Sequence, residues 1–190
     1  MLQQILSFLV DTAASFFVYL LLARFHFQWL GVPFRNQVGE FVVVVTNWIV
    51  RPARRVVPPL GALDLATAVA AWLLQAISLY TLFALRGGDL GAAPGVALAL
   101  LAAVALIDLV RLSVYMLVFA VILQAILSWV APHAASSPVL DAATRPFLRP
   151  VRRLVPPIAN IDLSPIVLLV LLQVLLFPLW SLRGAIGGVF

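Results

Sequence analysis

The sequence predicts an all-α polytopic membrane protein in which four transmembrane helices form two parallel tandem repeats. Apolar residues make up 64% of the 190 residues and charged residues only 10%, against about one half and one quarter in soluble domains. The mean hydropathy is +1.14, and a chain of this length cannot bury so much apolar surface in a core of its own. The apolar side chains must therefore face lipid.

An internal repeat is the second observation behind this prediction. Residues 51–65 recur 98 positions later as residues 149–163, with nine of the fifteen positions identical, and each copy precedes a long apolar run. The identical positions are Arg51/Arg149, Pro52/Pro150, Arg54/Arg152, Arg55/Arg153, Val57/Val155, Pro58/Pro156, Pro59/Pro157, Asp64/Asp162 and Leu65/Leu163. The chain therefore contains two copies of one membrane unit.

Four apolar runs are long enough to cross a hydrocarbon core of about 30 Å, which requires about 20 residues. They are residues 5–23, 65–85, 107–130 and 163–182. Residues 92–106 are apolar too, but they lie outside the repeat and either prolong the third span, re-enter the bilayer or form a fifth span. The chain is thus divided into a first repeat at 1–86, an apolar linker or helix extension at 87–106 and a second repeat at 107–190.

Each repeat also carries a shorter segment before its Arg-Pro motif. Residues 34–48 and their counterpart 137–146 are too short in apolar character to cross, so each is expected to form an interfacial amphipathic helix. Prolines disfavour a continuous helix, so these helices are expected to end near Pro52 or Pro150 and to continue as a rigid Arg-Pro bend that includes the later prolines. Asp64 and Asp162 precede the next spans, where a carboxylate can cap free N–H groups.

The arginines indicate how the chain is oriented. With four spans, nine of the twelve arginines fall on one side, whereas a fifth span would divide the two motifs between opposite faces. The positive-inside rule therefore favours four spans, with both motifs cytoplasmic and both termini outside. The two halves are then parallel repeats related by an axis along the membrane normal.

Three functions are open to the duplicated arginines. They can anchor the topology, bind lipid phosphates through bidentate guanidinium contacts, or form a docking surface for a partner. The same spacing in both copies favours a specific contact over general attraction, although duplication copies every residue. The candidate binding residues are Arg51, Arg54, Arg55, Arg149, Arg152 and Arg153.

Polar residues inside the apolar runs form a second candidate group. Gln75 and Gln173 are repeat equivalents that lie eleven residues beyond Asp64 and Asp162, which is about 16 Å along a helix and close to the midplane. Two such amides can hydrogen-bond across the pseudo-axis and hold the halves together. The alternative is a polar position on a solute path.

At an offset of 100 residues, Asp11 corresponds to Arg111 and Arg24 to Gln124. A carboxylate inside an apolar run is expected to face the protein interior and to be paired, so an ion pair between Asp11 and Arg111 across the repeats is a hypothesis. Asp108 competes for Arg111, because residues three apart on a helix are neighbours. The solute-path alternative would be lined by Asp11, Gln75, Arg111, Gln124 and Gln173.

Other chemistry finds little support in the sequence. The absence of cysteine excludes disulfides and thiolate metal sites. His26 and His133 are not repeat equivalents and lack metal-ligand spacing, and no nucleophile elbow, P-loop or dinucleotide fingerprint is present. We therefore expect no enzyme activity, metal or cofactor. The net charge of +5 comes from arginines beside spans, which points to anionic lipid headgroups and not to nucleic acid.

The chain resembles the YggT family (also called YlmG) of small membrane proteins in bacteria and plastids. The resemblance rests on the Arg-Pro-x-Arg-Arg-x-x-Pro-Pro motif followed by Asp, and on first helices that end at Arg24 to Trp29 and at Ser128-Trp129. It covers nearly the whole chain as two tandem copies, with Gln124 replacing Arg24 in the second. It implies an inner-membrane location and no settled molecular activity.

Members of this family are associated with division and nucleoid placement, with cofactor attachment to cytochrome complexes in plastids, and with tolerance of osmotic stress. The function we expect is therefore a non-enzymatic scaffold or assembly accessory of the bacterial inner membrane. Its partners would be anionic lipid headgroups, and in addition a membrane-protein partner or a second copy of the chain. The alternative is an ion or osmolyte channel or transporter.

Overall fold

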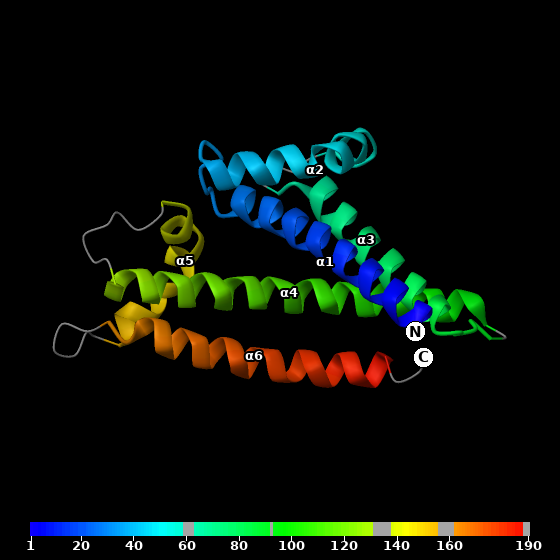
Figure 1. Ribbon diagram of the computed structural model, residues 1–190. Coiled ribbons are helices and arrows are strands. Elements are labelled where there is room, and N and C mark those ends of the chain that lie inside the picture. Colours follow the sequence, from blue (N-terminus) through cyan, green and yellow to red (C-terminus); the bar gives the residue numbers. More distant parts are fainter. Residues whose placement is uncertain (59–62, 92, 131–137, 156–161, 188–190) are drawn as a thin grey trace.

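The computed structural model describes residues 1–58, 63–91, 93–130, 138–155 and 162–187, and these residues fold into helices (Figure 1). The helices are α1 (Leu2–Trp29), α2 (Gln37–Val56), α3 (Leu65–Leu85), α4 (Pro94–Val130), α5 (Pro138–Leu154) and α6 (Ser164–Gly187). Within the described ranges there is no strand, so the all-α prediction is confirmed.

Four of these helices, α1, α3, α4 and α6, are long and apolar enough to cross a membrane, which confirms the predicted number of spans. The chain is a multi-pass membrane protein. Large apolar side chains are exposed along all four helices, as expected where the surrounding solvent is lipid rather than water.

Residues 94–106 of the apolar segment outside the repeat belong to α4, which begins at Pro94 and continues without interruption to Val130. A proline at the first helical position suits the start of a helix, because its missing N–H has no intrahelical partner there. With 37 residues, α4 is about 55 Å long, so its ends extend beyond a hydrocarbon core of about 30 Å.

Helices α2 and α5 are the amphipathic segments, and each one lies across the hairpin of its own repeat (Figure 1). Asn36 is the N-cap of α2, and its side chain accepts the N–H of Gly39 at 2.9 Å. Val42, Thr46 and Val50 face the spans and are buried, whereas Trp48 on the opposite face is 65% exposed. This division of faces is that of a helix lying in the membrane interface.

The prediction that these helices end near Pro52 and Pro150 is wrong. Helix α2 continues through Pro52 to Val56, and α5 continues through Pro150 to Leu154. Proline has no N–H to donate to the carbonyl four residues before it. Both prolines are exposed, so this carbonyl lies on the outer face of each helix. The opposite face of each helix is buried against the spans and holds it in place, which overrides the local cost of the proline.

The two repeats are parallel. Helices α1 and α4 both run away from the end where the termini lie, and α3 and α6 both return to it (Figure 1). The four spans form a row in the order α1, α3, α4, α6, because α3 packs against both α1 and α4, α6 packs against α4, and α1 meets α4 only marginally. Each repeat has its own apolar core, one around Leu21 and Val50 and the other around Val121 and Leu148.

Candidate functional site

The middle arginine of the first motif is joined to the start of the next span. Arg54 Nη2 lies 2.5 Å from Asp64 Oδ2, and the Asp64 side chain is fully buried. Asp64 is the N-cap of α3, where its carboxylate accepts the Thr67 hydroxyl at 2.7 Å and the Thr67 N–H at 3.4 Å. Burial raises the pKa of the Asp64 carboxyl, but the hydrogen bonds from Arg54 and Thr67 outweigh burial, so its pKa is lowered.

The second motif repeats this arrangement. Arg152 Nε lies 2.9 Å from Asp162 Oδ2, and Asp162 Oδ1 accepts the N–H of Ser164 at 2.9 Å at the start of α6. Burial raises the pKa of the Asp162 carboxyl less than the contacts with Ser164 and Arg152 lower it, so it too is depressed. In both repeats the ion pair therefore joins the end of the amphipathic helix to the beginning of the returning span.

The other motif arginines have a different environment. All four are exposed, and within the described ranges none of them makes an ion pair or a hydrogen bond. They are Arg51 and Arg55 on α2 and Arg149 and Arg153 on α5. Of the motif prolines, Pro58 is exposed, whereas Pro59, Pro156 and Pro157 lie outside the described residues. We call Arg51, Arg55, Arg149 and Arg153 together the Arg-Pro surface.

A second repeated contact joins each amphipathic helix to the first span of its repeat. The guanidinium of Arg24 is buried and donates to Thr46 Oγ1 at 2.9 Å. In the second repeat the Thr144 hydroxyl donates to Gln124 Oε1, and Gln124 Nε2 lies 3.5 Å from an Asp141 carboxylate oxygen. Gln124 therefore joins α4 to α5, and it is not among the residues that line the polar cavity around Asp11, Gln75 and Arg111.

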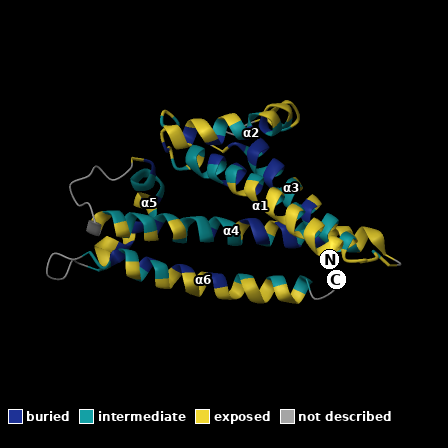
Figure 2. Cartoon of the chain, viewed as in Figure 1, coloured by how far each residue is buried: buried dark blue, intermediate teal, exposed yellow. Residues whose placement is uncertain are grey.

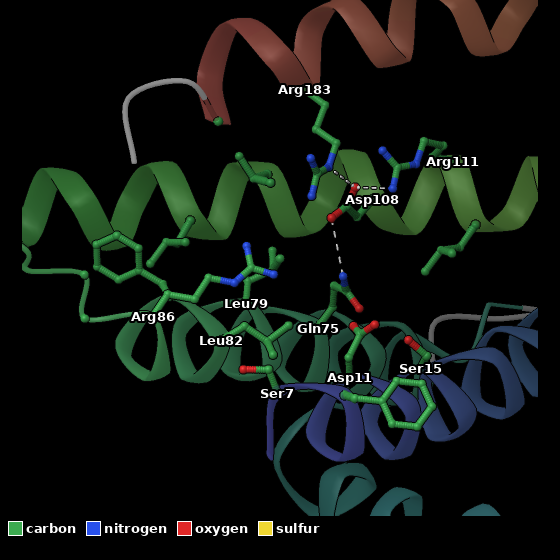
Figure 3. Close-up of a pocket in the computed structure, with 18 residues that line it drawn as sticks. Ser7, Asp11, Ser15, Gln75, Leu79, Leu82, Arg86, Asp108, Arg111 and Arg183 are labelled. Atoms are coloured by element: carbon green, nitrogen blue, oxygen red, sulfur yellow. Dashed lines mark hydrogen bonds and ion pairs between the residues drawn. The ribbon is translucent and has the colours of Figure 1, made fainter. Parts of the chain in front are cut away.

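Polar side chains from several spans meet in a cavity of about 790 Å³, which is also lined by residues of the turn after α3 (Figure 3). Its centre is Asp108 on α4, which is 2% exposed. Asp108 Oδ1 accepts Arg183 Nε of α6 at 2.8 Å and lies 3.2 Å from Arg111 Nη2, while Oδ2 accepts Gln75 Nε2 of α3 at 3.4 Å. One carboxylate therefore connects three spans.

Arg111 is held on its other side by an aromatic ring. Its guanidinium carbon lies 4.5 Å from the centroid of the Trp180 ring, a cation–π distance, and Trp180 Nε1 donates to the Tyr115 hydroxyl at 3.2 Å. Two of its buried nitrogens, Nε and Nη1, have no hydrogen-bond partner among the described residues. The cavity can therefore offer donors to a polar or anionic molecule.

Two sequence predictions about this region are wrong. Asp11 makes no ion pair with Arg111, which pairs instead with Asp108; Asp11 lines the same cavity and is exposed (Figure 3). Gln75 and Gln173 do not meet, since Gln75 donates to Asp108 and Gln173 is exposed on α6. Both predictions placed equivalent residues beside a pseudo-axis, whereas α3 packs against both α1 and α4, and α6 packs against α4.

Sequence reasoning also missed several residues of these contacts, among them Arg183, Thr46 and Thr144. Arg183 was not identified because its partner lies 75 positions away, and no short spacing signals such a pair. Thr46 and Thr144 were detectable, because they are themselves equivalent at the 98-residue offset of the repeat. The described residues contain no group of three or more metal-ligating side chains, and His133 lies outside them.

The family model for CCB3/YggT matches residues 3–85 and again residues 103–183. The chain belongs to this family. The two matched segments coincide with the two structural repeats, and the segment between them begins just after the end of α3 and includes the start of α4.

Two similar bacterial proteins match this chain over the same number of residues. The uncharacterized protein YggT of Escherichia coli K12 is 34% identical over 184 residues, which cover 96% of this chain and 93% of the relative. An uncharacterized protein encoded in the proC 3' region of Vibrio alginolyticus is 30% identical over 184 residues, covering 95% and 96%. No solved structure matches this YggT-family chain.

Proposed function

We propose that this YggT-family chain is a non-enzymatic scaffold or assembly accessory of the bacterial inner membrane, and that it binds anionic lipid headgroups through the Arg-Pro surface. The observation that carries the proposal is that the arginines of both motifs fall into the same two groups. One arginine of each motif is used by the ion pair with the aspartate of that motif, while two remain exposed and unpaired among the described residues. An anion outside the chain is their natural counter-charge.

The spacing of these arginines suits a phosphate. Arg51 and Arg55 are four residues apart on α2, as are Arg149 and Arg153 on α5, so each pair lies on one face of its helix. Guanidinium groups bind phosphate oxygens in bidentate fashion, and an arginine beside an anionic membrane surface contributes about 1 kcal/mol.

The depth of the helices is the second support. Trp48 and Val56 on the outer face of α2 are 65% and 82% exposed, and Leu154 at the end of α5 is 82% exposed. Apolar and aromatic residues that stand beside cationic ones are typical of a helix at headgroup level. We place this surface on the cytoplasmic side, as the positive-inside rule favours.

Arg24 adds an unbalanced charge to the first repeat. Arg24 is 5% exposed, and its hydrogen-bond partners Thr46 and Asn47 are both neutral. Its cationic neighbours Arg51 and Arg54 outnumber the single carboxylate of Asp64. A buried charge requires compensation, and a lipid phosphate at this interface would supply it.

The test is a lipid titration in nanodiscs in which phosphatidylglycerol progressively replaces phosphatidylcholine. A ligand that binds only the folded state raises the melting temperature. We expect the temperature to rise with the anionic fraction, and the rise to be lost when Arg51, Arg55, Arg149 and Arg153 are all changed to Gln. The matched control is Arg86→Gln, an exposed arginine at the opposite end. A rise that survives in the fourfold variant would overturn the proposal.

A second candidate function, an ion or osmolyte pathway, is supported by the polar cavity alone. Charged side chains inside spans are costly and usually functional, and the cavity brings Asp11, Gln75, Asp108 and Arg111 together. Flux into liposomes that is lost on Asp11→Asn with Gln75→Leu, and kept in the fourfold arginine variant, would support it. Liposomes without flux for any small ion or osmolyte would exclude it.

A further inference from the structure

The contact between the two repeats is made by one face of α3 and one face of α4. On α3 it includes Trp72, whose Nε1 donates to the Ala102 carbonyl at 2.9 Å, and Gln75, which donates to Asp108. On α4 it includes Leu109 and Met116, which pack into the apolar core of the first repeat. The two faces are complementary and belong to different repeats.

Because the chain is a tandem repeat, both faces exist a second time. The α6 counterparts of Trp72, Gln75 and Leu79 are Val170, Gln173 and Phe177, at the offset of 98. All three are exposed, Val170 by 58% and Phe177 by 78%. We call these three residues the α6 outer face.

The counterpart of the α4 face lies on α1. At the offset of 100, Leu109, Leu112 and Met116 correspond to Leu9, Thr12 and Phe16. These three, the α1 outer face, are also exposed, Leu9 by 55% and Phe16 by 48%. The exposed stretches run along α6 and along the first half of α1 (Figure 2). An interface that is used once inside the chain is therefore left open at both ends of its row of spans.

Exposed apolar residues alone do not indicate a protein partner, because lipid covers them as well as another helix does. Gln173 does indicate a partner, because its amide lies mid-span on an exposed face where lipid offers no hydrogen bond. Its equivalent, Gln75, is satisfied by a carboxylate on the neighbouring span. The α1 helix carries one carboxylate, Asp11, which is exposed and has no ion pair within the described ranges.

We propose that the α6 outer face binds the α1 outer face of a second copy of this chain, head to tail, in the way that α3 binds α4. The two faces differ, so the contact is heterologous. Since both repeats cross the membrane in the same direction, a second copy joined in this way stands upright in the same membrane, and repetition gives either a ring or an open row of copies in the membrane plane. Gln173 of one copy then lies opposite Phe8 of the next, three residues before Asp11.

The test is site-specific cross-linking, for which the cysteine-free chain is well suited. The contact equivalent to Gln75–Asp108 joins position 173 of one copy to position 8 of the next, and Phe8 is 68% exposed. We expect a short bismaleimide to join Phe8→Cys chains to differently tagged Gln173→Cys chains in native membranes, and to leave each single variant uncoupled when it is expressed alone.

The matched control is Leu175→Cys in place of Gln173→Cys. Leu175 lies on the same helix and is 49% exposed, and its equivalent Ile77 is 60% exposed and takes no part in the contact between repeats. Equal cross-linking at 173 and 175 would mean random collision, and Gln173→Cys that couples to itself would mean a symmetric contact. Either result, or a native chain that is monomeric by mass spectrometry from nanodiscs and gives no 8–173 product, overturns the proposal.

Discussion

The two ion pairs differ in burial, although their residues are equivalent. The Asp64 side chain is fully buried and accepts from Arg54 and Thr67, whereas the Asp162 side chain is 38% exposed and its partner Arg152 is 48% exposed. An exposed ion pair contributes little to stability because water screens the two charges. A buried carboxylate contributes more, because its loss would leave the groups that donate hydrogen bonds to it without an acceptor. The first repeat is therefore more dependent on its ion pair than the second.

Asp64→Asn is expected to lower the free energy of unfolding by about 1–3 kcal/mol, and Asp162→Asn by less. The pKa of the Asp64 carboxyl is lowered in the folded chain, so its contribution is fully present above the unfolded pKa of about 3.9 and is lost as the pH falls through the folded value. Melting temperatures in detergent at several pH values measure this. A difference between Asp64→Asn and the native chain that persists undiminished well below the folded pKa would contradict the assignment.

The Asp108 carboxylate contacts three side chains, those of Gln75, Arg111 and Arg183. Removing it leaves Arg111 and Arg183 inside the spans without their counter-charge, and an uncompensated buried charge costs about 3–5 kcal/mol. We expect Asp108→Leu to destabilise the chain strongly, and Asp108→Leu with Arg183→Leu to recover part of the loss. Thermal unfolding of the single and double variants, with Leu175→Ala as a lipid-facing control, gives the coupling. Additive effects of the two substitutions would contradict it.

At the scale of the element, α2 and α5 show why a local rule failed. Three prolines within eight positions disfavour helix by the chemistry of the residue itself, yet both helices pass through Pro52 and Pro150. Their buried faces, with Val50 and Val151, are fixed by packing on the spans, which is information that the spacing of the prolines does not contain. The spans themselves were predictable because their signal is a length of apolar sequence, which does not depend on the neighbours.

This difference leads to a prediction about Pro52. The proline is exposed inside a formed helix, and proline in a helix interior costs about 3 kcal/mol relative to alanine. Pro52→Ala is therefore expected to raise the melting temperature, with Pro58→Ala, which lies beyond the end of α2, as the control. If Pro52→Ala instead unfolds the chain, the helix does not pass through this position in the way described.

At the scale of the whole molecule, the repeat made most of the architecture predictable. Nine identities over fifteen positions, a matching pair of spans and an uneven distribution of arginines were enough to give four spans and two parallel halves. The packing of the halves was not predictable, since the pairings Asp11–Arg111 and Gln75–Gln173 assumed that equivalent residues approach an axis. The row of spans instead brings non-equivalent residues together, such as Gln75 and Asp108.

The parallel arrangement has a direct consequence for access from each side of the membrane. Val56 and Leu154 are repeat equivalents that end α2 and α5, and each is 82% exposed, whereas Asp89 is exposed in the turn between α3 and α4. Positions 56, 89 and 154 therefore suit chemical labelling, whereas Val151, which is also in the second motif, is buried and does not. Single cysteines at 56 and 154 are expected to react from one side with a maleimide that cannot cross the membrane, and a cysteine at 89 from the other.

Intact spheroplasts and inverted vesicles supply the two sides for this measurement. Because positively charged loops stay in the cytoplasm, we expect positions 56 and 154 to react only in inverted vesicles and position 89 only in spheroplasts. Reaction of all three with the opposite sidedness would invert the orientation and leave the fold intact, because both motifs would still share one face. Reaction of 56 and 154 from different sides cannot be reconciled with parallel repeats, since it requires an odd number of crossings between α2 and α5.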